Sequence, residues 1–140
     1  MIIMTVDLGK ARTGLAICDS AEMLSSPLTV IEQYNREKLL GRICEIASER
    51  RAERIVVGLP RNMDNSEGDS ALGAREFADA LREASGIEVV MQDERCTTVT
   101  AHHYLNQTDT RGKKRKAVID AVAATIILQD HLDWRKNNEK

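Results

Sequence analysis

The chain begins with a hydrophobic run that ends in a polar turn. Residues 2–6 (IIMTV) are apolar or β-branched, and Asp7-Leu8-Gly9 follows them. Such a run predicts a buried strand that ends in a turn. A second run, Gly14 to Cys18, predicts the other strand of a hairpin. Pro27 to Glu32 predicts a third strand at the edge of the sheet, where proline is tolerated.

The rest of the chain alternates helical and extended patterns. Apolar positions three and four residues apart predict an amphipathic helix from about Asn35 to Arg51, with Asn35 as its N-cap. A hairpin followed by such alternation predicts an α/β fold, in which a five-stranded mixed sheet has helices on both faces. The remaining predicted elements are a strand at Arg54–Leu59, a helix at Ser70–Ser85 closed by Gly86, a strand at Ile87–Gln92, a helix at Thr97–Asn106, a polar loop at Gln107–Lys114 and a final helix at Ala117–Trp134.

Composition indicates a folded protein of ordinary type. The 140 residues are 42% hydrophobic and 30% charged, which excludes disorder along the whole length and predicts one domain over residues 1–140. Three cysteines without a C-x-x-C pair argue against a disulfide framework or a zinc knuckle, and no stretch reaches the ~18 apolar residues of a membrane span. We therefore expect a cytoplasmic protein. Its net charge of −2 counts weakly against nucleic-acid binding, which depends more on local charge.

Acidic residues at three places in the chain are candidates for a metal site. Asp7 ends the first strand, and the glycines after it would let a metal or phosphate come close; a plain turn aspartate is the alternative. Asp120 lies on the apolar stripe of the last helix, where a carboxylate loses solvation unless it is paired or binds metal. Asp93-Glu94 ends the fifth strand, and the pattern leaves open which of the two points inward. Converging carboxylates suit Mg²⁺ or Mn²⁺, which can activate water for phosphodiester cleavage.

Two segments are candidates for phosphate contact. Arg61 and Asn62 precede a predicted helix whose N-terminal amides could hold a phosphate, although an ordinary connection explains them equally well. The run RGKKRK places five cations before the final helix, where positive charge opposes the helix dipole. Phosphate contact would offset this cost, and a solvated charge run is the alternative. The five cations are Arg111, Lys113, Lys114, Arg115 and Lys116.

These residues resemble the YqgF family of bacterial ribonuclease H-like, Holliday-junction-resolvase-like proteins. The matching segments are VDLGKARTGLAI, IVVGLPRNMDNSEG, DERCTT and KAVIDAVAATIILQDHLD, in family order and covering most of residues 2–133. The resemblance implies a ribonuclease H-like fold and a metal-dependent endonuclease that processes the 5′ end of pre-16S ribosomal RNA. It also implies that Asp7, Glu94 and Asp120 are the catalytic acids and hold the Mg²⁺ or Mn²⁺, and on that ground Glu94 is favoured over Asp93.

The resemblance extends to polar positions around the site. It implies that Arg12, Asn62 and Arg95 lie near the acids and face the nucleic acid. Two positions depart from the family pattern G-x-K-R-I-G after the first aspartate, because Ala11 and Thr13 replace the usual Lys and Ile. A possible interaction with phosphate is thereby missing.

Rival functions differ in chemistry or in substrate. A non-catalytic RNA-binding ribosome-assembly factor would bind RNA whether or not metal or Asp7 is present. A Holliday junction resolvase would use the same acids on branched DNA. An actin-like phosphate-binding ATPase needs two such domains, and this chain has room for one. We expect nucleic acid as the partner, with precursor ribosomal RNA before structured DNA, no membrane contact, and a monomer or homodimer.

Overall fold

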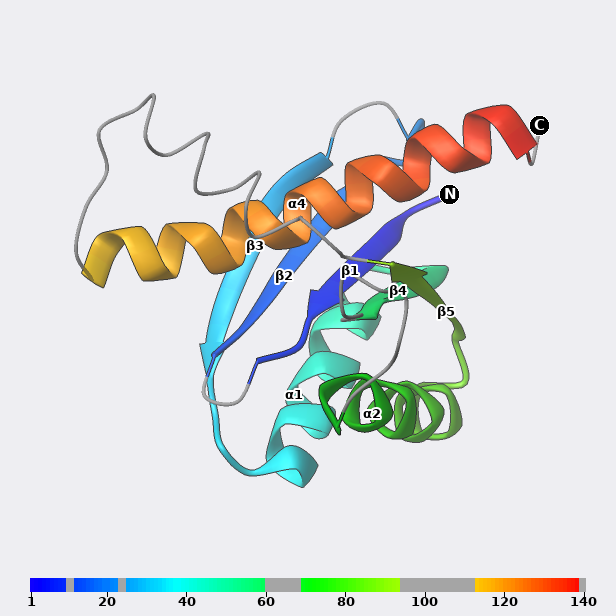
Figure 1. Cartoon of the computed structure of the whole chain (residues 1–140). Helices are drawn as coiled ribbons and strands as arrows, with labels where there is room; N and C mark the ends of the chain where they lie inside the picture. The colour runs from blue at the N-terminus through cyan, green and yellow to red at the C-terminus, as the bar shows by residue number, and fades with distance from the viewer. Residues whose placement is uncertain (10–11, 23–24, 60–68, 94–112, 139–140) are drawn as a thin grey trace.

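A five-stranded mixed sheet forms the centre of the molecule, in the order β3-β2-β1-β4-β5. The computed structural model describes residues 1–9, 12–22, 25–59, 69–93 and 113–138 (Figure 1). The first three strands pair antiparallel, and β4 and β5 run parallel to β1, which confirms the predicted hairpin and mixed sheet. The strands are β1 (Ile3–Asp7), β2 (Arg12–Cys18), β3 (Ser25–Glu32), β4 (Arg54–Leu59) and β5 (Glu88–Asp93).

Helices cover both faces of the sheet. On one face lie α1 (Arg36–Glu49) and α2 (Asp69–Ser85), and α4 (Lys113–Asn138) crosses the other face obliquely (Figure 1). Alternation along β1 divides its side chains between two hydrophobic clusters. Met4 and Val6 pack with α1 and α2, whereas Ile3 packs with α4. Within the described ranges, no helix combines the length and the hydropathy that a membrane crossing needs.

Local sequence explains where α1 and α2 begin or end. Asn35 Oδ1 accepts a hydrogen bond from the Lys38 amide at 3.0 Å, which confirms the predicted N-cap of α1. Gly86 follows α2 with a φ of 68°, and its amide donates to the Arg82 carbonyl, so the predicted end of α2 is also confirmed. The proline of β3, Pro27, lies on an edge strand as predicted.

The predicted bounds are wrong by the largest margin at the final helix. It was predicted at Ala117–Trp134, but α4 extends by four residues at each end, from Lys113 to Asn138. Lysine and arginine have high helix propensity without contributing to a hydrophobic stripe, so the pattern gave no sign of this first turn. The basic residues 113–116 therefore belong to the helix and not to a preceding loop. The helix predicted at residues 97–106 lies outside the described residues.

Candidate active site

Asp7 lies where the central strand of the sheet reaches the surface. It is the last residue of β1 and is partly exposed, whereas the four residues before it are fully buried. Ile3 of the same strand packs in the α4 cluster, and strand alternation puts Asp7 on that same face. The carboxylate is thus carried by a rigid, buried strand at the carboxyl edge of the sheet.

Glycines flank Asp7 on both neighbouring strands. Gly14 of β2 is its partner in register, and the pairing of Val6 with Val57 makes Gly58 its neighbour on β4. At these two positions the sheet contributes backbone alone, because glycine has no side chain. Neither neighbouring strand therefore places a Cβ directly across from Asp7, whereas other residues would place one about 5 Å away.

The turn between β1 and β2 brings Arg12 to the same edge. A Cβ on Gly9 would collide with the carbonyl oxygen of Arg12, so this close approach requires glycine. Arg12 begins β2 and pairs in register with Glu32 of β3, with 3.8 Å between its Nε and a carboxylate oxygen. Glu32 is 80% exposed, so solvent screens this ion pair. Arg12 thus places a weakly held positive charge at the edge of the sheet where Asp7 ends β1.

The strand β5 leads to the predicted pair Asp93-Glu94. Its alternate residues face opposite sides of the sheet, since Val89 packs towards α1 and α2 and Val90 packs towards α4. Asp93 is the last residue of β5 and pairs in register with Leu59 of β4. Glu94 lies outside the described residues. The choice between Asp93 and Glu94 therefore stays a prediction.

Position 120 belongs to α4, although its side chain is outside the described part. The stripe predicted for this helix contains Ala123, Ala124 and Ile127, and all three are buried. Ala124 and Ile127 pack directly on the sheet in the α4 cluster. The described part of the stripe is therefore confirmed as the face of α4 that covers the sheet. Asp120 precedes Ala124 by about one helical turn.

The structure describes only part of the predicted site. Among the side chains it describes, no three His, Cys, Asp or Glu residues gather closely enough to hold a metal ion, and Asp7 is the one predicted acid present among them. The first turn of α4 contains four of the predicted cations and no acid. The predicted site residues that lie outside the described ranges are Arg61, Asn62, Glu94, Arg95 and Arg111.

Sequence reasoning missed a polar cluster at the opposite, amino edge of the sheet. Arg54, the first residue of β4, is buried; its Nε donates to Glu88 of β5, and its Nη1 lies 3.2 Å from His131 Nε2 on α4. A guanidinium group only donates, so His131 Nε2 is the acceptor. The Trp134 ring stacks on His131 with 5.8 Å between centroids. The sequence signal for this cluster is an arginine at the start of an otherwise apolar strand.

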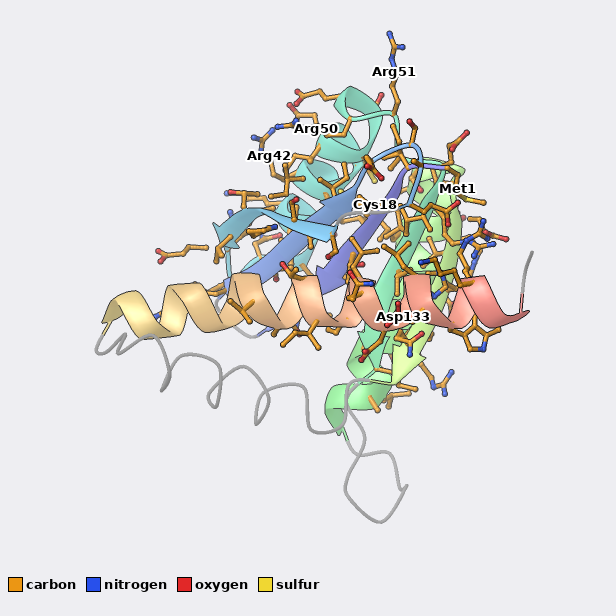
Figure 2. The ribbon with its side chains drawn as sticks, turned by 90° about the horizontal axis from the view of Figure 1, so that it is seen from above. Met1, Cys18, Arg42, Arg50, Arg51 and Asp133 are labelled. Atoms are coloured by element: carbon orange, nitrogen blue, oxygen red, sulfur yellow. The ribbon has the colours of Figure 1, made fainter. Side chains whose placement is uncertain are left out.

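A second contact at the amino edge fastens the same helix. Arg135 of α4 makes two hydrogen bonds to the carboxylate of Glu22, one of them 3.2 Å from Nη2 to Oε2. These bonds lower the pKa of Glu22 below its ordinary value of 4.5. Met1 and Cys18 lie close together at this edge, where the Cys18 thiol donates to the Met1 carbonyl at 3.6 Å (Figure 2). Burial raises the pKa of that thiol, so the group behaves as part of the core.

Comparison with known families identifies the chain. Residues 1–134 match the family model RuvX, described as Holliday junction resolvase. The chain therefore belongs to the RuvX family. Two similar relatives come from Chloroflexus aurantiacus, 42% identical over 98% of this chain and 90% of the relative, and Clostridium botulinum, 41% identical over 95% and 97%. Both are named "Putative pre-16S rRNA nuclease".

Solved structures share the fold of this RuvX chain. Thermus thermophilus RuvC in complex with a Holliday junction substrate has a TM-score of 0.64 at 14% identity, covering 100% of this chain and 98% of that one. The Fowlpox virus resolvase with Holliday junction DNA has a TM-score of 0.57 at 13% identity, covering 100% of both. At such identities the likeness shows the fold alone, and it confirms the predicted ribonuclease H-like fold. Family and relatives together confirm the nuclease class, whose members bind nucleic acid and use divalent metal ions.

Proposed function

We propose that this chain is a metal-dependent endonuclease that processes the 5′ end of pre-16S ribosomal RNA, with Asp7 as its first metal ligand. The position of Asp7 supports this proposal most strongly. Its carboxylate stands at the carboxyl edge of the sheet, on the α4 face, between two strands that carry Gly14 and Gly58 beside it. Carboxylate oxygens suit a small hydrated cation, and neither neighbouring strand places a side chain directly across from Asp7.

Glu94 and Asp120 complete the proposed set of metal ligands. The family pattern supports Glu94, which directly follows the last residue of β5 in the sequence. The buried stripe of α4 supports Asp120, because position 120 lies one helical turn before Ala124, which packs on the sheet. A set of carboxylate oxygens fits Mg²⁺ or Mn²⁺. When bound, the metal would supply an activated water and stabilise the leaving oxygen.

Two sets of cations would hold the RNA backbone. Arg12 lies at the carboxyl edge in a weak ion pair, and residues 113–116 place four cations in the first turn of α4. Positive charge there opposes the helix dipole, and phosphates would offset that cost. The remaining proposed nucleic-acid contacts are Arg61, Asn62, Arg95 and Arg111.

The two candidate substrates rest on different observations. The relatives at 41–42% identity are named for pre-16S rRNA, and they support RNA as the substrate. The family model is described as Holliday junction resolvase, which supports branched DNA as the second candidate. Both substrates are phosphodiesters, so the same acids would serve either of them.

Cleavage of a labelled, 5′-extended pre-16S rRNA fragment with Mg²⁺ or Mn²⁺ tests the proposal. We expect Asp7→Asn to lower the rate by about 100-fold or more, because the metal contributes several kcal/mol to the transition state. The Tm should be little changed. Asp79→Asn, which alters an exposed carboxylate on α2, is the matched control and should cleave like the wild type.

A four-way DNA junction assayed in parallel separates the two substrates. Faster metal-dependent cutting of the junction than of the RNA would replace rRNA with branched DNA as the substrate. Tight RNA binding without cleavage by the wild type at any metal concentration would contradict the nuclease proposal and support the assembly-factor alternative.

A further inference from the structure

Tyr34 is the most exposed of the large hydrophobic residues that the structure describes. It lies between β3 and α1, and 80% of its surface is open to solvent. The other two are Leu72 at 59% and Trp134 at 46%, and Trp134 already stacks on His131. A single exposed aromatic ring is common on protein surfaces. Three features distinguish Tyr34 from an ordinary exposed residue. They are its fixed backbone, its position relative to Asp7 and the charged residues near it.

Side chains on either side of Tyr34 hold its backbone in place. The Gln33 side-chain oxygen accepts a hydrogen bond from the Asn35 amide at 3.1 Å. Asn35 in turn caps α1 by accepting from the Lys38 amide at 3.0 Å. Little backbone freedom is therefore left to lose when a ligand contacts the ring, which favours binding at this position.

The sheet register places Tyr34 at the same edge as Asp7. Asp7 pairs with Gly14 of β2, and Gly14 pairs with Val30 of β3, four residues before Tyr34. Strands lie ~4.8 Å apart and residues advance ~3.3 Å along them, so the Cα atoms of Asp7 and Tyr34 are within roughly 16 Å of each other. At ~3.4 Å per stacked nucleotide, this distance corresponds to about five nucleotides of one strand.

A positively charged hollow adjoins this connection. It has a volume of about 540 Å³ between β3 and α1, and Lys38 and Arg42 supply its cations. Arg42 projects from α1 (Figure 2) and pairs with Glu45 at 3.6 Å. Lys38 makes no ion pair with any residue that the structure describes. The hollow is lined by Ile31, Gln33, Lys38, Gly41, Arg42 and Glu45.

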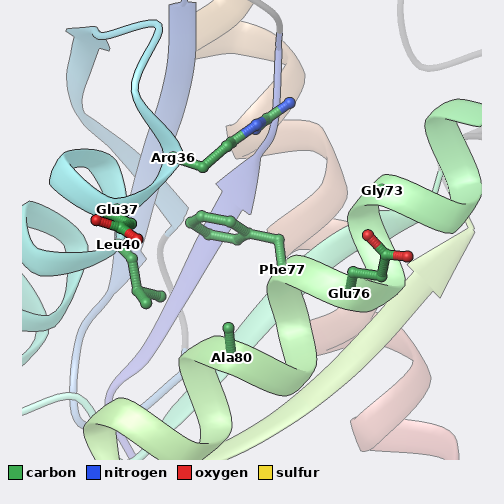
Figure 3. A pocket seen from close by; sticks show the side chains of 7 residues that line it. All are labelled: Arg36, Glu37, Leu40, Gly73, Glu76, Phe77 and Ala80. Carbon is green, nitrogen blue, oxygen red and sulfur yellow. The ribbon is translucent and has the colours of Figure 1, made fainter.

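The pocket between α1 and α2 is less suited to a nucleic-acid strand. Arg36 packs over the ring of Phe77, 5.9 Å from its centroid, so this cation and this aromatic face are already engaged with each other (Figure 3). Glu37 and Glu76 also line the pocket and would repel a phosphate. Tyr34 and Lys38, in contrast, are four residues apart in the sequence at the start of α1, and both side chains are exposed.

We infer that Tyr34 is a stacking platform for an unpaired base of the nucleic acid, with Lys38 contacting a neighbouring phosphate. This inference rests on the proposed function, because it places Tyr34 beside the nucleic-acid strand that is cleaved at the Asp7 site. A ring can stack on the face of a base only where that base is not already stacked in a duplex. The preferred substrate is therefore RNA with a single-stranded segment a few nucleotides from the cleaved bond.

Binding to a catalytically inactive protein tests this inference separately from cleavage. In the Asp7→Asn background, Tyr34→Ala should weaken binding to an RNA hairpin with a single-stranded 5′ extension by about fivefold or more. Binding to the same hairpin without the extension should be unchanged. Tyr34→Phe keeps the ring and should keep the affinity. Leu72→Ala, at another exposed hydrophobic residue, is the matched control and should bind like its parent.

A fluorescent variant reports the stacking directly. Trp134 is the one tryptophan of the chain, so Tyr34→Trp combined with Trp134→Phe places a single indole at the proposed platform. We expect the extended hairpin, and not the blunt one, to quench its fluorescence. Equal loss of affinity for both RNAs in Tyr34→Ala, no loss for either, or no quenching would overturn the inference. If the wild type fails to cleave RNA while these binding differences are seen, the nuclease proposal fails and the platform stands.

Discussion

At its C-terminal end, α4 carries basic residues where the helix dipole favours them, and at its N-terminal end it carries them where the dipole opposes them. Arg135 and Lys136 lie in the last turn, near the free carbonyl groups. The first turn, residues 113–116, consists of four cations without an acid, near the free amides. The same type of charge is therefore stabilising at one end of this helix and destabilising at the other.

Arg135, at the C-terminal end, serves the fold. Arg135 binds the carboxylate of Glu22 through two hydrogen bonds. One turn earlier, His131 accepts from the buried Arg54, which also binds Glu88. Charged groups taken out of water are stable only when they have such partners. These contacts hold α4 on the amino edge of the sheet.

We propose a different role for the cations at the N-terminal end. Their position costs stability, so another interaction must offset the cost for the arrangement to be useful. The proposed offset is the phosphate backbone of RNA, which would also pass Asp7 and Tyr34. In this proposal, the charge of Arg135 complements the helix dipole and makes a structural contact, whereas the charges of residues 113–116 oppose the dipole and bind a ligand.

Removing the N-terminal cations should have the largest effect. Replacing residues 113–116 together with Gln should weaken RNA binding tenfold or more at moderate salt. The slope of log affinity against log salt should flatten by roughly 0.7–0.9 for each phosphate that the variant no longer neutralises. The free energy of unfolding should rise by a few tenths of a kcal/mol, because the repulsion from the helix dipole is removed. Binding titrations across salt concentrations and urea unfolding measure the two effects.

The matched control is Lys136→Gln, which removes one cation from the opposite end of α4. It should leave RNA binding unchanged and lower the stability slightly. Similar decreases in RNA affinity from both ends would contradict the division of roles along the helix.

Breaking the Arg54 cluster should have the next largest effect, on stability alone. Arg54→Met leaves the Glu88 carboxylate and His131 Nε2 without their donor. We expect the free energy of unfolding to fall by about 2 kcal/mol, measured by urea denaturation. Arg42→Met, which breaks an exposed ion pair with Glu45, should change it by less than about 1 kcal/mol. A cluster that served RNA instead of the fold would show the opposite result, with reduced RNA affinity at unchanged stability.

The smallest effect concerns acid stability at the same end of α4. Hydrogen bonds from Arg135 lower the pKa of Glu22 below 4.5 in the folded protein. A carboxylate with a lowered folded pKa contributes stability at pH values above its unfolded pKa and loses it as the pH falls through the folded pKa. Wild-type stability should therefore decrease as the pH falls below about 4.5. In Glu22→Gln this part of the decrease should be absent, which thermal unfolding at several acidic pH values would show. A Glu22→Gln profile that matches the wild type would mean that the Arg135 pair contributes nothing in solution.

The hydrophobic pattern by itself determined most of the fold. Each strand and the helices α1 and α2 were predicted to within two residues at either end, because a face that must be buried imposes its own spacing on the chain. Asn35 and Gly86 marked helix ends through their local backbone chemistry. The start of α4 was missed because residues 113–116 add helix propensity without adding to the hydrophobic stripe.

The tertiary structure alone decided how distant residues meet. Asp7 was a candidate from sequence, but its glycine neighbours depend on the register of β1 against β2 and β4. Asp93 pairs in register with Leu59 because β5 runs parallel to β4 in the assembled sheet. Arg54 and His131 are 77 residues apart in the chain and share a hydrogen bond. Local sequence patterns indicate which face of a helix or strand is buried. Strand register and the packing of helices on the sheet determine which side chains share a site. Register and packing arise only when the whole sheet has formed.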